Sequence, residues 1–146
     1  MEEGKNMGLK DREMQDMEMQ NKEMQEKLLA YRMLDSRLKG LVQQRELVAQ
    51  KILEIRATIV SIEEAMKSKG DVLFSLGSQA HVHGEIKNRD SVIVEVGAGI
   101  ALERTPEQAK TALVKRMGEL EAALQDLQRD LSRVSSAMSE LQEQFE

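Results

Sequence analysis

The sequence contains no cysteine, no tryptophan and a single proline among its 146 residues. The lack of cysteine excludes disulfide bonds and thiolate metal sites, and it suits a reducing compartment such as the cytoplasm. Aromatic residues make up only 2% of the chain, although apolar residues make up 40%. A globular core of this size usually uses more aromatic side chains, so this composition is better suited to narrow seams of Leu, Ile, Val and Met in a coiled coil.

Long apolar runs and basic blocks are also missing from the chain. No run of about 18 apolar residues occurs, so no membrane-spanning helix is expected. The first residues, MEEGKNMGLKDRE, are too polar for a secretory signal. The net charge is −5 with both signs interspersed, which weighs against nucleic acid and anionic membranes as partners. The length fits one domain that covers residues 1–146.

Residues 71–104 are the one stretch in which apolar residues recur at every second position. A period of two places alternate residues on one face of a β-sheet. The pattern breaks at Gly77-Ser78, at residues 87–90 and at Gly97-Ala98-Gly99, which are typical turn sequences. The stretch therefore predicts four short strands paired as two β-hairpins.

The segment before the hairpins, residues 9–69, is predicted to form one helix with a Met-rich N-terminal leader. From Leu34 to Met66 its apolar residues are spaced alternately by four and three, a heptad seam interrupted by Arg45. The helix is expected to stop at Gly70. Residues 1–8 contain two glycines and are expected to fray.

The segment after the hairpins, residues 105–146, is predicted to form a second helix. Thr105 and Gln108 form a capping box, and Pro106 suits the first helical position. From Leu113 to Phe145 the four-three spacing appears again. The second helix thus carries an apolar ladder like that of the first.

The two ladders have equal length and are joined by a compact insert, so they can pair in antiparallel orientation. If Met66 faces Leu113, then Leu34 faces Phe145, and residues before about 30 have no helix to pair with. Asp130 then becomes a candidate partner for Arg45. The predicted fold class is mainly α with a small β part: a long antiparallel coiled-coil α-hairpin with two β-hairpins inserted between the helices.

Few residues suggest chemistry. His81 and His83 share one strand face, but no third ligand accompanies them, so a solvated face is favoured over a metal site. Gly97-Ala98-Gly99 lacks the Lys-Ser/Thr that follows the glycines of a phosphate-binding loop, and a tight turn is favoured. No Ser/His/Asp grouping is present, and a coiled coil encloses no cleft of ligand size. We therefore expect no enzyme activity, no cofactor and no metal.

The methionines are concentrated near the N terminus, where seven of the ten lie within the first 33 residues. Methionine fills gaps in helical seams, and it also makes adaptable binding surfaces. Both interpretations remain open for this stretch, because the antiparallel register provides it with no partner. Exposed apolar surface of this kind usually marks an interaction site.

One segment resembles a known family. Residues 94–104, VEVGAGIALER, followed by Glu107-Gln108-Ala109, are similar to the VSVGAGVAVER segment and second-helix start of alpha-class prefoldin subunits. Residues 73–78, LFSLGS, resemble the first strand and turn of that family, although Ser75 stands where many members have proline. The resemblance covers residues 28–146, whereas the leader, residues 1–27, departs from the family pattern.

This resemblance implies an ATP-independent chaperone in the cytoplasm. Two alpha and four beta subunits would form a hexamer whose hairpins build a double β-barrel platform. The complex would hold unfolded client proteins between the coiled-coil ends and pass them to a group II chaperonin. Isolated hairpins are marginally stable and leave open edges, so partner strands are expected on the face formed by Val72, Phe74, Leu76, Val92, Val94, Val96, Ile100 and Leu102.

The free helix ends are the expected client-binding sites. The residues assigned to this role are Met14, Met17, Met24, Leu28, Met138, Leu141 and Phe145. The alternative is a structural coiled-coil adaptor, or a prefoldin-like subunit of another complex, that binds one defined partner through the Met-rich leader.

Overall fold

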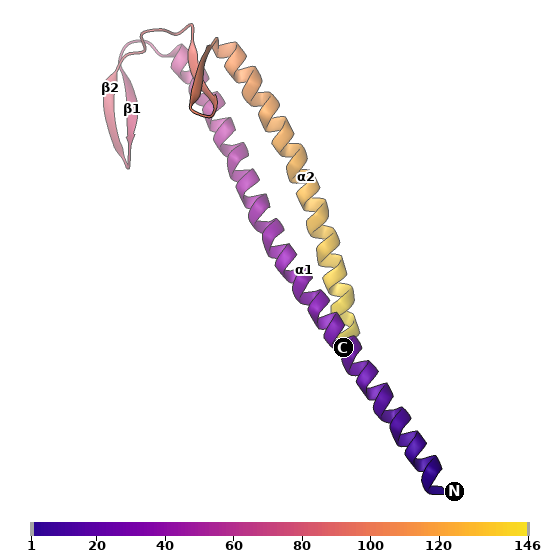
Figure 1. Ribbon diagram of the computed structural model, residues 1–146. Helices are drawn as coiled ribbons and strands as arrows, with labels where there is room; N and C mark the ends of the chain where they lie inside the picture. The colour runs from indigo at the N-terminus through magenta and orange to yellow at the C-terminus, as the bar shows by residue number, and fades with distance from the viewer. Residues whose placement is uncertain (1, 146) are drawn as a thin grey trace. The chain divides into compact units, whose positions relative to one another are not determined.

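The computed structural model describes residues 2–145, and the side chains of residues 8–145. Helix α1 (Glu2–Lys67) is followed by strands β1 (Val72–Gly77), β2 (Ala80–Gly84), β3 (Val92–Gly97) and β4 (Ile100–Arg104), and then by helix α2 (Pro106–Phe145) (Figure 1). The chain divides into a terminal unit, residues 1–45 with 127–146, and a hairpin unit, residues 46–126. Two long helices with two β-hairpins between them confirm the predicted fold class.

Helix α1 begins at Glu2, earlier than the predicted start at residue 9, and residues 2–8 are helical rather than frayed. Gly4 and Gly8 do not end the helix. A glycine in a helix costs about 1 kcal/mol relative to alanine, whereas extending a helix that has already formed adds one hydrogen bond for each residue. A long downstream helix can therefore carry both glycines.

The core of the terminal unit joins one buried residue of α1, Leu41, to three residues of α2: Leu131, Val134 and Met138. Tyr31, Leu34, Leu38 and Leu127 pack around this cluster. Within this unit, Figure 1 shows α1 running alongside α2 and continuing past the C terminus. Residues 8–26 are accordingly exposed throughout.

The predicted register places Leu41 opposite Met138, and both residues lie in the buried core of the terminal unit. Phe145 was expected to face Leu34, but its aromatic partner is Tyr31, with ring centroids 6.5 Å apart and planes at 80°. Edge-to-face geometry of this kind is the favoured arrangement of two aromatic rings. Phe145 therefore contacts α1 about one turn before Leu34. Asp130, expected to pair with Arg45, lies instead 3.9 Å from Arg133 on its own helix.

The helices of the hairpin unit pair through Ile52, Ile55, Ile62 and Ala109, all buried. Two ion pairs cross between them: Arg56 Nη2 to Glu121 Oε1 at 3.4 Å, and Lys110 Nζ to Glu63 Oε1 at 3.9 Å. The seam of α2 therefore begins at Ala109, one turn before the predicted Leu113. Counting only large apolar residues missed Ala109, whose small side chain is 1% exposed.

The capping box at the start of α2 is confirmed by two reciprocal hydrogen bonds. The Gln108 backbone N–H donates to Thr105 Oγ1, and the Thr105 N–H donates to Gln108 Oε1, both at 3.1 Å. These bonds satisfy two backbone donors that a helix start otherwise leaves unpaired. They also fix the point at which the chain leaves β4 and enters α2.

Candidate functional site

The two hairpins form an internal repeat with a period of 20 residues. β1 pairs with β2 and β3 with β4, each antiparallel, and equivalent residues occupy equivalent places: Phe74 faces Val82 as Val94 faces Leu102. The register shifts at the same point in both, between Ser75 and Gly77 and between Glu95 and Gly97. Each hairpin is a separate two-stranded sheet, so the chain presents two similar β-surfaces.

The residues predicted for subunit assembly all lie on these hairpins, and most are exposed. Phe74 is 42% exposed, and Val72, Val92 and Val94 are half-buried. The remaining four are also exposed: Leu76, Val96, Ile100 and Leu102. A two-stranded sheet that exposes large apolar side chains is expected to be covered by another chain.

Sequence reasoning missed three further exposed apolar residues of the hairpins: Leu73, Val82 and Ile93. Val82 lies opposite Phe74 and extends the same face. Leu73 and Ile93 occupy the other strand phase, at equivalent places in the repeat. The sequence did contain a sign of these residues, because β1 and β3 carry apolar residues at both strand phases. A strand that is covered on both faces lacks strict alternation of apolar and polar residues.

The turn of the second hairpin explains the glycine-rich motif. Ala98 has φ of 52° and Gly99 has φ of 73°, and both central residues of a type I′ turn require such positive values. The motif thus acts as a tight turn, as predicted from its lack of a following Lys-Ser/Thr.

Gly84 lies directly beneath the ring of Phe74. A Cβ atom added at Gly84 would lie 2.7 Å from Phe74 Cε2, closer than carbon atoms can pack. Replacing Gly84 with alanine is therefore expected to displace the Phe74 ring and weaken binding of any chain that packs on it, by roughly tenfold. Titration calorimetry with a beta-class subunit measures this loss. Gly40→Ala, at a helical site where an added Cβ meets nothing within 4 Å, is the control and should bind normally.

One histidine of β2, His83, pairs with a carboxylate. His83 Nδ1 lies 2.6 Å from Asp71 Oδ2, and both side chains are largely exposed. Among the described residues, no three His, Cys, Asp or Glu side chains are grouped to hold an ion. This contact joins β2 to Asp71, the residue just before β1.

The predicted client-binding residues fall into two groups. Met14, Met17, Met24 and Leu28 are 43–63% exposed on the free part of α1. In contrast, Met138 is buried in the terminal core, and Leu141 and Phe145 are half-buried. Met19, Leu29 and Met33 were not predicted but are also exposed. The apolar surface at this end therefore lies mainly on α1.

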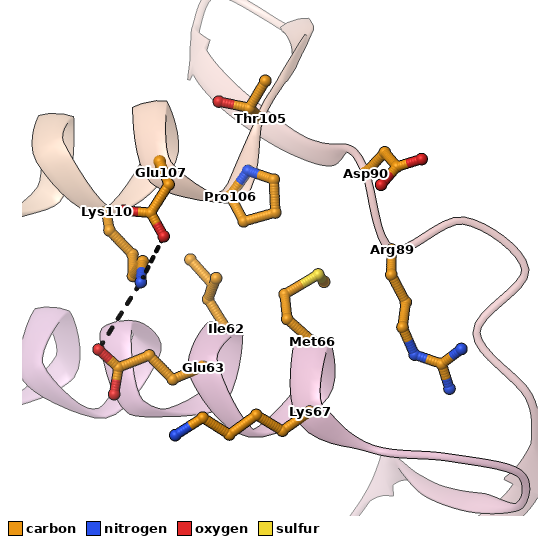
Figure 2. Close-up of a pocket in the computed structure, with 10 residues that line it drawn as sticks. All are labelled: Ile62, Glu63, Met66, Lys67, Arg89, Asp90, Thr105, Pro106, Glu107 and Lys110. Carbon is orange, nitrogen blue, oxygen red and sulfur yellow. Dashed lines mark ion pairs between the residues drawn. The ribbon is translucent and has the colours of Figure 1, made fainter.

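Although no cleft of ligand size was expected, a pocket of about 530 Å³ lies within the hairpin unit. It forms where the end of α1, the linker between the hairpins and the start of α2 meet. Ile62, Met66 and Pro106 line its apolar part (Figure 2). On one side Lys110 Nζ lies 2.9 Å from Glu107 Oε1 and bridges to Glu63.

The hydrogen bond to Glu107, aided by both carboxylate charges, raises the pKa of Lys110 above its usual value. Because the folded-state pKa is raised, this stabilisation holds at neutral pH and is lost as pH rises through the raised value.

These features define a class of protein: a coiled-coil protein with two small β-hairpins that expose apolar side chains. Among the described residues, no helix is long and apolar enough to cross a bilayer. The prefoldin subunit family model matches residues 34–146, and the chain belongs to the prefoldin family, a family of chaperones.

Individual relatives place the chain in the alpha class. It is 28% identical over 114 residues to the alpha subunit of prefoldin from Methanococcoides burtonii, covering 77% of this chain and 83% of that protein. It is 30% identical over 113 residues to the alpha subunit from Methanosarcina barkeri, covering 74% and 78%. The expected resemblance to archaeal alpha-class subunits is confirmed.

A solved structure shares the fold. Filamentous prefoldin from Methanocaldococcus jannaschii superimposes with a TM-score of 0.68, at 21% identity, over 77% of this chain and 94% of that chain. Residues 1–33 lie outside the matched family region, so all five exposed methionines of the described residues belong to a segment that the family model does not include.

Proposed function

We propose that this chain is the alpha subunit of a cytoplasmic complex of two alpha and four beta subunits that holds unfolded proteins without ATP. The observation that carries this proposal is the pair of equivalent hairpins with exposed apolar faces. Beta-class strands would cover these faces and complete a double β-barrel platform. The helices would then act as spacers that carry client-binding ends away from the platform and present clients to a group II chaperonin.

The client-binding surface is proposed to lie at the end of the terminal unit. Met14, Met17, Met24 and Leu28 supply flexible, polarisable side chains that can pack against apolar segments of many shapes. Leu141 and Phe145 border this surface. Met138 is buried between the two helices, so it stabilises the helix pair by packing. It becomes available to clients only if the helix ends separate.

Deleting residues 1–27 tests this assignment. In the assembled complex, the deletion is expected to reduce suppression of client aggregation severalfold, because the largest exposed apolar surface of the terminal unit is removed. Light scattering of several unrelated denatured proteins measures this effect. The matched control replaces Gln15, Gln20 and Gln25 with alanine, which keeps the helix and its methionines. Unchanged protection after the deletion would show that the leader is not the client site.

The same client panel separates a holdase from an adaptor. The leader lies outside the matched family region, which favours the alternative that it binds one defined partner. A holdase protects unrelated denatured proteins, whereas an adaptor protects none of them.

Native mass measurement after co-expression with a beta-class subunit tests the assembly. A 2:4 mass supports the proposed complex. An open series of homopolymers would indicate head-to-tail pairing of the two equivalent hairpins, since heterologous contacts that do not close form filaments. A stable monomer in the presence of beta subunits would contradict the proposal.

A further inference from the structure

The pocket at the helix–hairpin junction is lined by Arg89, which forms no ion pair with any described residue. Arg89 lies on the linker between the hairpins, and its Nε atom is buried without a hydrogen-bond partner among the described residues. A buried donor that has no hydrogen-bond partner destabilises the folded protein. Such a group is expected to find a partner when the protein is in its working state.

The backbone around Arg89 is held by local hydrogen bonds. The Asp90 N–H donates to Asn88 Oδ1 at 2.8 Å, and Asn88 Nδ2 donates to Ser91 Oγ at 3.2 Å. Arg89 lies between the bonded residues of this turn, so the turn limits the freedom of its backbone. Figure 2 shows the Arg89 side chain extending toward the end of α1, while the carboxylate of Asp90 points away from its guanidinium.

The charges around the pocket are unevenly matched. On one side of the pocket, Lys110 forms ion pairs with both Glu63 and Glu107. On the other side, no ion pair joins Arg89 or Lys67 to an acidic group of the described residues. Asp90 also lines this edge, so two cations, Lys67 and Arg89, stand against one carboxylate there. The pocket therefore combines an apolar floor with an excess of positive charge at one edge, which suits an acidic group next to an apolar one.

We propose that this pocket binds an acidic side chain of a neighbouring subunit, whose carboxylate pairs with Arg89 while an adjacent apolar side chain packs on Ile62, Met66 and Pro106. A carboxylate can accept from Nε–H and one Nη–H of a guanidinium at once, which satisfies the buried donor. The occupant is placed in a neighbouring subunit because the linker joins the two hairpins that assembly is proposed to cover. This inference rests on the proposed function and adds a specific polar contact to it.

The first test measures the affinity of the full chain for a beta-class subunit at low and moderate salt. Arg89→Gln is expected to raise Kd by about 10- to 100-fold, because a charge-assisted, bidentate contact is lost, and to reduce the dependence of binding on salt. Arg89→Lys restores the charge without the planar fork and should recover only part of the loss. Lys87→Gln removes an equal charge from an exposed site on the same linker and should change Kd by less than about twofold.

The second test identifies the partner group. In the complex formed by the Arg89→Lys chain, a zero-length carbodiimide is expected to join the new amine to a carboxylate of another subunit, which mass spectrometry of the cross-linked peptide assigns. A cross-link only to acidic residues of the same chain overturns the proposal.

The outcomes distinguish this inference from the proposed function. If the unaltered chain forms no complex with beta subunits, the assembly proposal fails, and this contact fails with it. If the unaltered chain assembles and Arg89→Gln binds with the same Kd and salt dependence, only the pocket contact is overturned. Full recovery by Arg89→Lys, or an equal loss in Lys87→Gln, also overturns it, because nonspecific charge then explains the effect.

Discussion

Replacing Phe74 and Val94 together with aspartate is expected to abolish assembly with beta-class subunits. The two residues occupy equivalent places in the hairpin repeat, so the change puts one charge on each proposed interface. Burying an unpaired carboxylate costs several kcal/mol, and 1.4 kcal/mol corresponds to a tenfold change in Kd. The expected loss of affinity is therefore at least about 100-fold, measured by native mass spectrometry and analytical ultracentrifugation.

A control variant separates this effect from unfolding. Gln79→Asp places the same charge in the exposed turn of the first hairpin, outside both strand faces, and should leave the complex much closer to normal. Circular dichroism should show unchanged helix content in both variants, because neither site contributes to the helix pairing. A 2:4 complex of normal affinity from the doubly substituted chain would show that this hairpin face is not the interface.

Replacing Ile55 with alanine is expected to cause the largest loss of stability from a single core change. Ile55 is 4% exposed between the helices of the hairpin unit. Removing a buried isoleucine side chain typically costs about 2–5 kcal/mol through lost burial and the cavity that remains. For a chain of this length, such a loss lowers the Tm by roughly 10 °C. Thermal unfolding followed by circular dichroism measures this shift.

Leu53→Ala is the matched control for the core substitution. Leu53 lies two residues away on the same helix and is 62% exposed. Its truncation should change stability by no more than about 0.5 kcal/mol. Equal losses in the two variants would contradict the assignment of Ile55 to the helix pairing.

The buried apolar residues of this chain stabilise the fold, whereas the exposed ones lie on the surfaces proposed for binding. The buried set is small and confined to the helix pairing: Leu41, Ile52, Ile55, Ile62, Ala109, Leu131, Val134 and Met138. The larger exposed set lies mainly on the hairpins and on the free part of α1. Such a distribution is unfavourable for a solitary molecule in water, and it is consistent with a protein completed by other subunits and by clients.

The order of elements followed directly from local residue patterns. Alternation in residues 71–104 predicted both hairpins, and Thr105 with Gln108 predicted the start of α2, because strand periodicity and helix caps depend on neighbours in sequence. The exposed apolar face of the hairpins was also predictable in outline, since one strand phase carries most of its apolar residues.

Other features depended on contacts between distant segments, which local patterns do not encode. The pairing of Phe145 with Tyr31, the burial of Ala109 and the burial of Met138 all depend on the register between helices, and several registers satisfy the same heptad spacing. The unpaired Nε of Arg89 is a further case, because a single arginine in a linker acquires significance only when α1 and α2 enclose it. Periodicity was therefore sufficient for the elements and their faces, whereas packing between the elements decided which residues remain available for binding.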